Sequence, residues 1–449
     1  MAASRRSRPP DDAAPHAVER AVAALVREIV PAGAGVAVAL SGGRDSIALL
    51  DALSRLAPHV RPYAFHVHHG LSASADAWAS FCRGACAARG VAFAMREVTV
   101  DARRDGVEAA ARAARYDALR SLAREHGVHD VLLAHHADDQ AETLLLQLLR
   151  GAGPHGLAAM PRVALDRGVR WIRPLLSVSR AAIDDYVGTR HLAYVDDESN
   201  AHAQHRRNAL RAHVVPALCA IAPGYPATLA RAAEHQASAA ALLDELAALD
   251  AAPAFDGRSL DVDVLAVLSA ARAANVVRWF LRQRSLRPPS TARLAAMLRQ
   301  LRAPRRDARV DFAHDGARVS LYRGRLFVHR PPAQAFLERW NGASEVRLPH
   351  RTLVFTKTHG GGIAVRWLDH ANVTIRSGTR GERLALAGRV TPRPVADLLR
   401  EAGVPRWERL ALPRIYRDEA LVALPEAGVG AAFAAAPGEA GVSFAWYPG

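Results

Sequence analysis

The six residues 41–46, SGGRDS, combine two glycines, two serine hydroxyls and a carboxylate between two apolar segments. The apolar segment at 36–40 is too short for a helix and is bounded by glycines, which is typical of a buried strand. The apolar residues after the loop keep the spacing of a helix face, at Ile47, Leu49, Leu50 and Leu53. The loop therefore joins a strand's carboxyl end to a helix N-terminus, where free N–H groups and the helix dipole attract an anion. We predict a phosphate-binding loop.

Two better-known nucleotide motifs do not fit the chain. The loop of kinases and GTPases, G-x-x-x-x-G-K-[ST], needs a lysine after its glycines, and the only lysine of the chain is Lys357. A second glycine cluster, GAGPHG at 151–156, matches the dinucleotide pattern G-x-G-x-x-G, but it follows a predicted helix instead of a strand and contains Pro154. A turn that faces a substrate is the better interpretation of this cluster.

Two clusters of histidines and acids supply potential metal ligands, HVHHG at 66–70 and HHADDQAET at 135–143. Histidine and aspartate at strand ends are typical of zinc sites. The spacing is not H-x-x-x-H on a helix, however, and a zinc site leaves the loop at 41–46 unexplained. Carboxylates beside bound phosphates suit Mg²⁺, which is held by one or two acids and phosphate oxygens. We therefore expect magnesium.

Two further groups have both a structural and a functional interpretation. Cys82 and Cys86 lie one helical turn apart, and core packing is the expected role for such cysteines. A redox or persulfide role would favour an exposed C-x-x-C arrangement. Glu108, Arg112 and Arg115 fall on one face of a predicted helix, where a solvated, salt-bridged face is equally compatible with the spacing.

The elements that must position these clusters alternate between strands and helices. We predict strands at 36–40, 61–68, 91–98 and 130–135, with helices after residue 45 and at about 72–89, 106–126 and 138–150. This alternation favours an α/β fold with a parallel, doubly wound sheet, which binds ligands at the carboxyl ends of its strands. Each polar cluster begins where an apolar segment ends, so we expect the clusters to converge on one crevice.

The rest of the chain predicts two further domains. A long helix at about 226–250 is followed by more helical pattern, and the pattern becomes strand-like after Pro304. Pro331 and Pro332 mark a linker. We predict a disordered tail at 1–15, a catalytic domain at 16–222, a mainly helical domain at 223–330 and a small α+β domain at 331–449.

Charge is concentrated in the second half of the chain. The 449 residues carry a net charge of +15, of which residues 272–309 contribute eleven arginines against one acid, and residues 372–417 ten arginines against four acids. Such stretches are typical of a polyanionic partner. A compositional bias that replaces lysine with arginine is the alternative, but it does not explain why acids are absent from 272–306.

Composition also bears on where the protein acts. Three cysteines in 449 residues suit a reducing compartment better than a disulfide scaffold. The N-terminal segment has basic residues but no apolar core, and no stretch of about 18 apolar residues follows. We predict a cytoplasmic protein with no membrane partner.

The motifs together resemble a known family. SGGRDS resembles the pyrophosphate-binding loop (PP-loop) of the N-type ATP pyrophosphatases, and the chain as a whole is similar to the tRNA(Ile)-lysidine synthetases within that group. The further motifs that carry the resemblance are HVHHGLS (66–72), EAAARAARY (108–116), AHHADDQAET (134–143), GAGPHGLAAM (151–160), RPLL (173–176), DESNAHAQHRRNALR (197–211), IRSGTRGERLALAGR (375–389) and LLREAGVPRWERLALPRIY (398–416). The weakest stretch is roughly 226–330.

The resemblance implies a two-step ligation on RNA. ATP adenylates the C2 oxygen of the wobble cytidine in the CAU anticodon of tRNA(Ile), and the ε-amine of free L-lysine then displaces AMP to give lysidine. Decoding changes from AUG to AUA. The substrates implied are therefore ATP, lysine and tRNA(Ile), with Mg²⁺ as the metal.

The resemblance also assigns roles to residues. It implies that ATP is bound by Ser41, Gly42, Gly43, Arg44, Asp45 and Ser46, that Asp45 holds Mg²⁺, and that Asp139 and Glu142 hold lysine. The catalytic residues implied are Asp45, His135, and Arg112 or Arg115 at the α-phosphate. The tRNA-binding residues expected, from the motifs and from the charge, are Arg206, Arg207, Asn208, Arg211, Arg376, Arg380 and Arg383, which gives the domains at 223–330 and 331–449 roles in tRNA binding and recognition. His68 and Glu198 depart from the usual family pattern, in which Asn and Pro are common.

Two alternatives stay open at this point. A tRNA-thiolating relative would share the loop and the adenylation, but it would need catalytic cysteines near the crevice. An RNA-binding module without catalysis would consume no ATP with any tRNA. The sequence leaves the oligomeric state open, with a dimer as one option.

Overall fold

The computed structural model describes residues 16–56, 59–68, 70, 74–99, 107–196, 206–302, 310–330, 335–348, 351–368, 372–388 and 391–448. The chain divides into two compact units, residues 1–243 and 244–449, each of which is described by itself. The boundary between them falls within one long helix, α10 (Tyr225–Ala251). The tail predicted at 1–15 lies outside the described residues.

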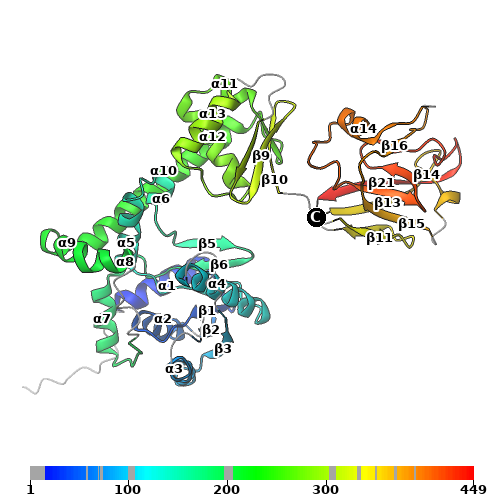
Figure 1. Ribbon diagram of the computed structural model, residues 1–449. Helices are drawn as coiled ribbons and strands as arrows, with labels where there is room; N and C mark the ends of the chain where they lie inside the picture. Colours follow the sequence, from blue (N-terminus) through cyan, green and yellow to red (C-terminus); the bar gives the residue numbers. More distant parts are fainter. Residues whose placement is uncertain are drawn as a thin grey trace, which may run out of the picture. The chain divides into compact units, whose positions relative to one another are not determined.

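The first unit is built on a six-stranded sheet in the order β3-β2-β1-β4-β6-β5 (Figure 1). The strands are β1 (Gly35–Ala39), β2 (Arg61–His68), β3 (Ala92–Glu97), β4 (Asp130–Leu132), β5 (Val163–Asp166) and β6 (Val169–Ile172). All neighbouring pairs are parallel except β5 with β6. Arg167 and Gly168 join that pair with positive φ angles of 48° and 84°, as a two-residue hairpin turn requires. The predicted parallel sheet is therefore confirmed, with an antiparallel edge strand added.

Helices cover both faces of this sheet, as a doubly wound fold requires. Apolar side chains of α1, α2, α3 and α7 pack on one face, and those of α4 pack on the other against Phe65 and Trp171. The helices are α1 (Ala17–Ile29), α2 (Arg44–Ser54), α3 (Ala75–Ala87), α4 (Val107–Glu125), α5 (Ala137–Leu148), α6 (Pro154–Leu157) and α7 (Arg180–Thr189). The helices predicted at 72–89, 106–126 and 138–150 match α3, α4 and α5 to within three residues at each end.

The strand register brings three chain segments together. Val38 of β1 pairs with Ala64 of β2 on one side and with Leu132 of β4 on the other. On the far side of β4, Leu132 pairs with Ile172 of β6, and the Leu133 N–H donates to the Ile172 carbonyl at 2.8 Å. The segments that follow β1, β4 and β6 therefore leave the same edge of the sheet.

A helical segment follows the sheet. It comprises α8 (Arg206–Ala209), the π-helical turn η3 (Leu210–Val214), α9 (Val215–Ile221) and α10. Across the described ranges, no single helix is long and apolar enough to cross a membrane; residues 207–221 and 225–251 meet a test of length and composition only as a pair, bent by 98°.

The second unit begins with a helical layer on a small sheet. Helices α11 (Asp263–Val267), α12 (Ala270–Gln283) and α13 (Thr291–Leu301) share a core with β7 (Ser259–Asp261), β8 (Asp311–His314), β9 (Ala317–Tyr322) and β10 (Arg325–His329), in the order β7-β10-β9-β8. Ser290 caps α13 by accepting from the Arg293 N–H.

The remainder of the second unit is mostly β-structure. One sheet has the order β11-β15-β18-β19-β20, another β12-β13-β21-β14, and β16 pairs with β17. The bounds are β11 (Leu337–Arg339), β12 (Glu345–Leu348), β13 (Arg351–His359), β14 (Ile363–Ala364), η4 (Val365–Trp367), β15 (Val373–Ser377), β16 (Arg383–Leu384), β17 (Arg393–Pro394), α14 (Val395–Glu401), β18 (Pro413–Arg417), β19 (Ala420–Leu424), β20 (Gly428–Val429) and β21 (Ala440–Pro448). Within its described residues, the predicted small α+β domain is thus a β-rich structure with one α-helix, α14, of seven residues.

Candidate active site

The SGGRDS loop has the form expected for an anion cradle. Gly42 adopts a φ of +87°, which favours glycine. The Ser46 hydroxyl donates to the Gly43 carbonyl at 2.8 Å and accepts from the Ser41 N–H at 3.3 Å, so the turn is closed from within. No side chain caps α2, whose N-cap is Gly43, and the N–H groups of its first turn are therefore free to meet a phosphate.

Cys82 packs beneath this loop. A Cβ placed on Gly42 would lie 3.1 Å from the Cys82 Sγ, so a glycine is needed at this close approach. Burial raises the pKa of Cys82 to about 12 and that of Cys86 to about 11, and both side chains are fully buried. Since the nucleophile of cysteine chemistry is the thiolate, these thiols are inert, as the core interpretation predicts.

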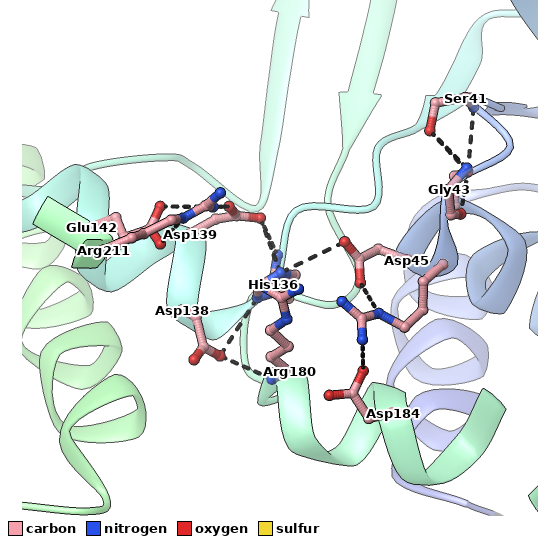
Figure 2. A network of polar contacts seen from close by, with 12 residues as sticks. Ser41, Gly43, Asp45, His136, Asp138, Asp139, Glu142, Arg180, Asp184 and Arg211 are labelled. Carbon is pink, nitrogen blue, oxygen red and sulfur yellow. Dashed lines mark hydrogen bonds and ion pairs between the residues drawn. The ribbon is translucent and has the colours of Figure 1, made fainter. Parts of the chain in front are cut away.

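Opposite the loop, the N-terminus of α5 contributes a buried histidine between three carboxylates. Figure 2 shows Asp45, Asp138 and Asp139 around His136. The His136 Nε2 atom lies 3.8 Å from Asp45 Oδ2 and 3.5 Å from Asp139 Oδ2, and its Nδ1 atom lies 3.5 Å from Asp138 Oδ2. The clusters after β1 and β4 therefore meet at one edge of the sheet, as predicted for them, whereas the third predicted cluster, at 66–70, does not contribute a described side chain.

The charges in this cluster depend on one another. Burial raises the pKa of Asp45, and Asp139 adds to that effect, while His136, Arg44 and Arg180 oppose it. Burial alone would lower the pKa of His136, but the three carboxylates outweigh it and raise that pKa. The Asp45 Oδ1 atom is buried and makes no hydrogen bond within the described residues. A carboxylate oxygen left in that state fits a cation as its partner.

His136 is a site residue that the sequence analysis missed, because it assigned only the neighbouring His135 a role. The signal was present in the two adjacent histidines at the end of a strand. His136 is also the N-cap of α5, where its own N–H donates to Asp139 Oδ2 at 3.2 Å. It therefore fixes the orientation of Asp139 relative to Asp45.

The Arg44 side chain is directed away from the loop that contains it. Its Nη1 atom lies 2.6 Å from Asp184 Oδ1 on α7, its guanidinium lies 5.8 Å from the ring of Tyr194, and its Nε atom lies 3.9 Å from Asp45 Oδ1. ATP binding by Arg44 thus stays a prediction that concerns its backbone at the start of α2 more than its charge.

A cationic pocket lies on the face of the sheet covered by α4. Its members are Arg112, Arg115, Arg173 and His135, the first two from α4 and the others from the segments after β6 and β4. Burial lowers the pKa of His135 to about 3, and the three arginines add to that effect against Asp139. His135 is therefore neutral near pH 7, and its buried Nδ1 has no hydrogen-bond partner among the described residues.

The carboxylates expected to hold lysine are paired with arginines expected to hold tRNA. Glu142 is 4% exposed and accepts from Arg211 Nε at 2.6 Å and Nη2 at 3.0 Å, while Arg207 Nε lies 3.1 Å from it. The Arg211 Nη2 atom also reaches Asp139 Oδ1 at 3.4 Å. The α8–η3 segment thus lies directly against α5. Asn208 is half-buried, and the Arg206 side chain lies outside the described residues.

The two described histidines at the carboxyl end of β2, His66 and His68, do not join this site. His66 is buried, and its Nδ1 lies 2.8 Å from the Leu40 carbonyl, while His68 Nε2 lies 3.1 Å from Asp76. His69 lies outside the described residues. Across the part of the chain that the structure describes, no group of three or more His, Cys, Asp or Glu residues could hold a metal. A zinc site therefore has no support among those residues.

The GAGPHGLAAM segment is fixed against α5. The Gln140 side chain donates to the Met160 carbonyl at 2.9 Å and accepts from the Met160 N–H at 3.0 Å. Its one turn of helix, α6, begins at Pro154 and follows a loop, so no dinucleotide-type strand–turn–helix is present here. The substrate-facing interpretation is the one compatible with this geometry.

The three arginines expected to bind tRNA in the second unit differ in how free they are. Arg376 lies 2.8 Å from Glu419 and stacks on the Tyr416 ring at 4.0 Å. Arg383 donates to the Pro392 carbonyl at 2.7 Å, and Arg380 has no polar partner among the described residues. Arg380 is thus the most available of the three.

Three known domain families match the chain. They are the PP-loop domain at residues 15–218, the TilS substrate binding domain at 260–327 and the TilS substrate C-terminal domain at 373–446. Two similar relatives, each named tRNA(Ile)-lysidine synthase, come from Ralstonia nicotianae and Alkalilimnicola ehrlichii. Both are 41% identical to this chain, over 92% of it, and the alignments cover 92% and 95% of the relatives.

Among solved structures, a U34-tRNA thiolase from Methanococcus maripaludis aligns with 49% of this chain and 77% of its own chain. The sequence identity is 18% and the TM-score is 0.42. A likeness at this level carries no argument about activity.

Proposed function

This chain belongs to the tRNA(Ile)-lysidine synthase family, and from that premise we propose that it joins free L-lysine to the wobble cytidine of tRNA(Ile). In the first step the cytidine C2 oxygen bonds to the α-phosphorus of ATP, and pyrophosphate leaves with the electrons of the broken bond. In the second step the ε-amine of lysine bonds to C2 and AMP leaves. The PP-loop match supports the use of ATP.

One observation carries the proposal, namely the convergence of the phosphate loop and the acidic end of α5. Asp45 and His136 are 3.8 Å apart across the crevice, and Asp139 is 3.5 Å from the same histidine nitrogen. A phosphate held at α2 and an amine held at Asp139 would therefore lie close enough to react on one RNA base. A site that held only phosphate would bind the nucleotide but would have no carboxylate to hold the amine of lysine.

The phosphate side of the crevice fits ATP with a magnesium ion. Free N–H groups at the start of α2 suit the pyrophosphate end. The Asp45 Oδ1 atom, which makes no hydrogen bond among the described residues and lies 3.9 Å from Arg44 Nε, fits Mg²⁺, which would neutralise phosphate charge when bound. Neutral His135 and the arginines of α4 suit the α-phosphate, where charge accumulates during transfer.

The opposite side of the crevice fits lysine. Asp139 and Glu142 lie one helical turn apart on α5, where they offer two carboxylates to two ammonium groups. One of them can accept the proton that the ε-ammonium must lose before its nitrogen attacks. Both are paired with Arg211 in the free enzyme, so lysine must replace or share that partner.

The RNA side of the reaction draws on both units. Arg207 and Arg211 adjoin α5, where the anticodon base must enter, and the second unit carries the arginines of 272–309 and 372–417. A thiolating activity has less support, because the fully buried Cys82 and Cys86 have raised pKa values and cannot supply a thiolate.

The test is a product assay with the full-length chain, ATP, Mg²⁺, radiolabelled lysine and a tRNA(Ile) transcript with a CAU anticodon. We expect label in the RNA and one AMP formed per lysine incorporated. A transcript with a UAU anticodon is the matched control and should stay unlabelled. Sulfur incorporation from a persulfide donor, or no AMP with any tRNA, would overturn the proposal.

A further inference from the structure

Arg173 is a buried arginine without a counter-charge. Its side chain is 7% exposed, and no Asp or Glu pairs with it among the described residues. The Nη1 atom donates to the Pro161 carbonyl at 2.9 Å, whereas the buried Nε–H has no hydrogen-bond partner there. A guanidinium in this state is costly unless an anion completes it.

Arg173 lies where an anion bound to it would belong to the reaction site. It follows β6 directly, beside the segment after β4 that leads to His135. Trp171, two residues earlier and on the same face of the sheet, packs edge-on against Tyr116 of α4 with ring centroids 4.8 Å apart. Arg173 therefore faces the α4 side of the crevice, where Arg112 and Arg115 also lie.

Among the described residues, no Asp or Glu side chain pairs with Arg112, Arg115 or Arg173. Among the described residues Arg115 makes no hydrogen bond or ion pair, and Arg112 reaches only the Tyr116 hydroxyl, at 3.4 Å. Burial lowers the pKa of Arg173 and the nearby Arg112 adds to that effect, while the Tyr116 side chain opposes it. Like charges gathered in a pocket are stabilised by a ligand with several anionic oxygens, such as a phosphate.

We propose that Arg173 is a third arginine of a phosphate pocket and donates its Nε–H to an oxygen of the phosphate at which adenylyl transfer occurs. The inference deepens the proposed function and rests on it. As the cytidine oxygen bonds to the α-phosphorus and the bond to pyrophosphate breaks, negative charge shifts among the phosphate oxygens. A donor already fixed by the Pro161 carbonyl needs no reorganisation to meet that charge.

The test compares wild type with Arg173→Gln in single-turnover AMP formation at saturating tRNA. We expect a rate about 10²-fold lower, the usual cost of one preorganised donor. The KM for lysine, measured on preformed adenylated tRNA, should stay within twofold. Arg170→Gln is the matched control, since Arg170 lies three residues earlier, on β6, but is neutralised by Asp130 at 2.6 Å. It should leave the adenylation rate unchanged.

Sulfur substitution identifies the phosphate and separates catalysis from structure. In wild type, one diastereomer of ATP with sulfur on the α-phosphorus should react more slowly than ATP, and Arg173→Gln should remove that difference. If the variant instead removes the effect of sulfur at the wobble phosphate of the tRNA, the pocket holds an RNA phosphate. A slower variant with both sulfur effects intact would overturn the proposal, because Arg173 would then act through Pro161 alone. If the wild-type protein incorporated no lysine at all, the proposed function itself would be rejected.

Discussion

Arginines in the two units of this chain are used in different ways. In the first unit, the buried Arg173 and the partly buried Arg115 have no acidic partner among the described residues. In the second unit, arginines of the basic stretches are largely engaged: Arg272 pairs with Asp250, Arg282 with Asp244 and Arg393 with Glu401. Of the two arginines that are buried among the described residues, Arg173 in the first unit has no acidic partner, whereas Arg414 in the second is paired with Glu382. A binding site for a polyanion is therefore indicated less well by net charge along the sequence than by arginines that lack an acidic partner.

The acid at the centre of the crevice should give the largest effect. Asp45→Ala removes the carboxylate whose buried Oδ1 makes no hydrogen bond within the described residues, and we expect AMP formation to fall by at least about 10²-fold because phosphate charge is no longer neutralised. The Kd for tRNA, measured by filter binding, should change by less than about threefold. Asp184→Ala, which removes the partner of Arg44, is the control and should retain most activity. AMP formation at the wild-type rate in Asp45→Ala would refute the metal assignment.

The carboxylates expected to hold lysine extend the comparison between paired and unpaired arginines, because both contact Arg211 when no lysine is bound. Glu142→Gln should raise the KM for lysine by about 10- to 100-fold, since a charge-assisted hydrogen bond contributes about 1.5–3 kcal/mol. The KM for ATP should change much less. Glu125→Gln is the matched control, because it breaks the exposed ion pair between Glu125 on α4 and Arg96 on β3. It should alter neither constant. Equal rises in both constants for Glu142→Gln would contradict the lysine site.

The sequence was sufficient to predict the local elements and the crevice, for physical reasons. Strands such as β1 and helices such as α5 are encoded in the spacing of nearby apolar residues, and parallel strands place their carboxyl ends at one edge. The edge strand β5 escaped notice because its pairing depends on a hairpin turn at Arg167 and Gly168.

The side-chain partners could not be predicted in the same way. Nothing local in the sequence indicates that Arg44 pairs with Asp184, or that Arg211 pairs with Glu142, because these residues are brought together only by tertiary packing. The role of Arg173 was hidden for the same reason. The RPLL motif contains it, but only the structure shows that it is buried without an acid.

Arginines of the second unit that lack an acidic partner among the described residues should differ in a salt titration from those that have one. Replacing Arg380 and Arg383 with Gln should reduce the slope of log K for tRNA against log salt by roughly one unit or slightly less for each lost phosphate contact. Replacing Arg272 and Arg282 with Gln should leave that slope unchanged and lower the free energy of unfolding, because Asp250 and Asp244 lose their partners. If both pairs reduced the slope equally, partner contacts would not predict which arginines bind RNA.

The smallest effect concerns a buried histidine that is structural in the first unit. Burial lowers the pKa of His66 below its ordinary 6.5, so below that pH the unfolded chain binds a proton that the folded chain does not. Stability from this group is complete above pH 6.5 and declines as the pH falls below it. The free energy of unfolding of wild type should therefore decrease between pH 7.5 and pH 5.5 more than that of His66→Gln. Parallel curves would mean that His66 does not titrate differently on folding.

The central claim is that arginines near His135 act on the phosphate chemistry, whereas those of the second unit bind RNA. The rate of AMP formation at saturating tRNA tests this claim most directly. Saturation removes differences in RNA affinity, so the rate reports only on the phosphate chemistry. We predict that Arg115→Gln lowers this rate by about 10²-fold, while Arg380→Gln leaves it within twofold of wild type. A rate that fell equally in both variants, or only in Arg380→Gln, would contradict the account.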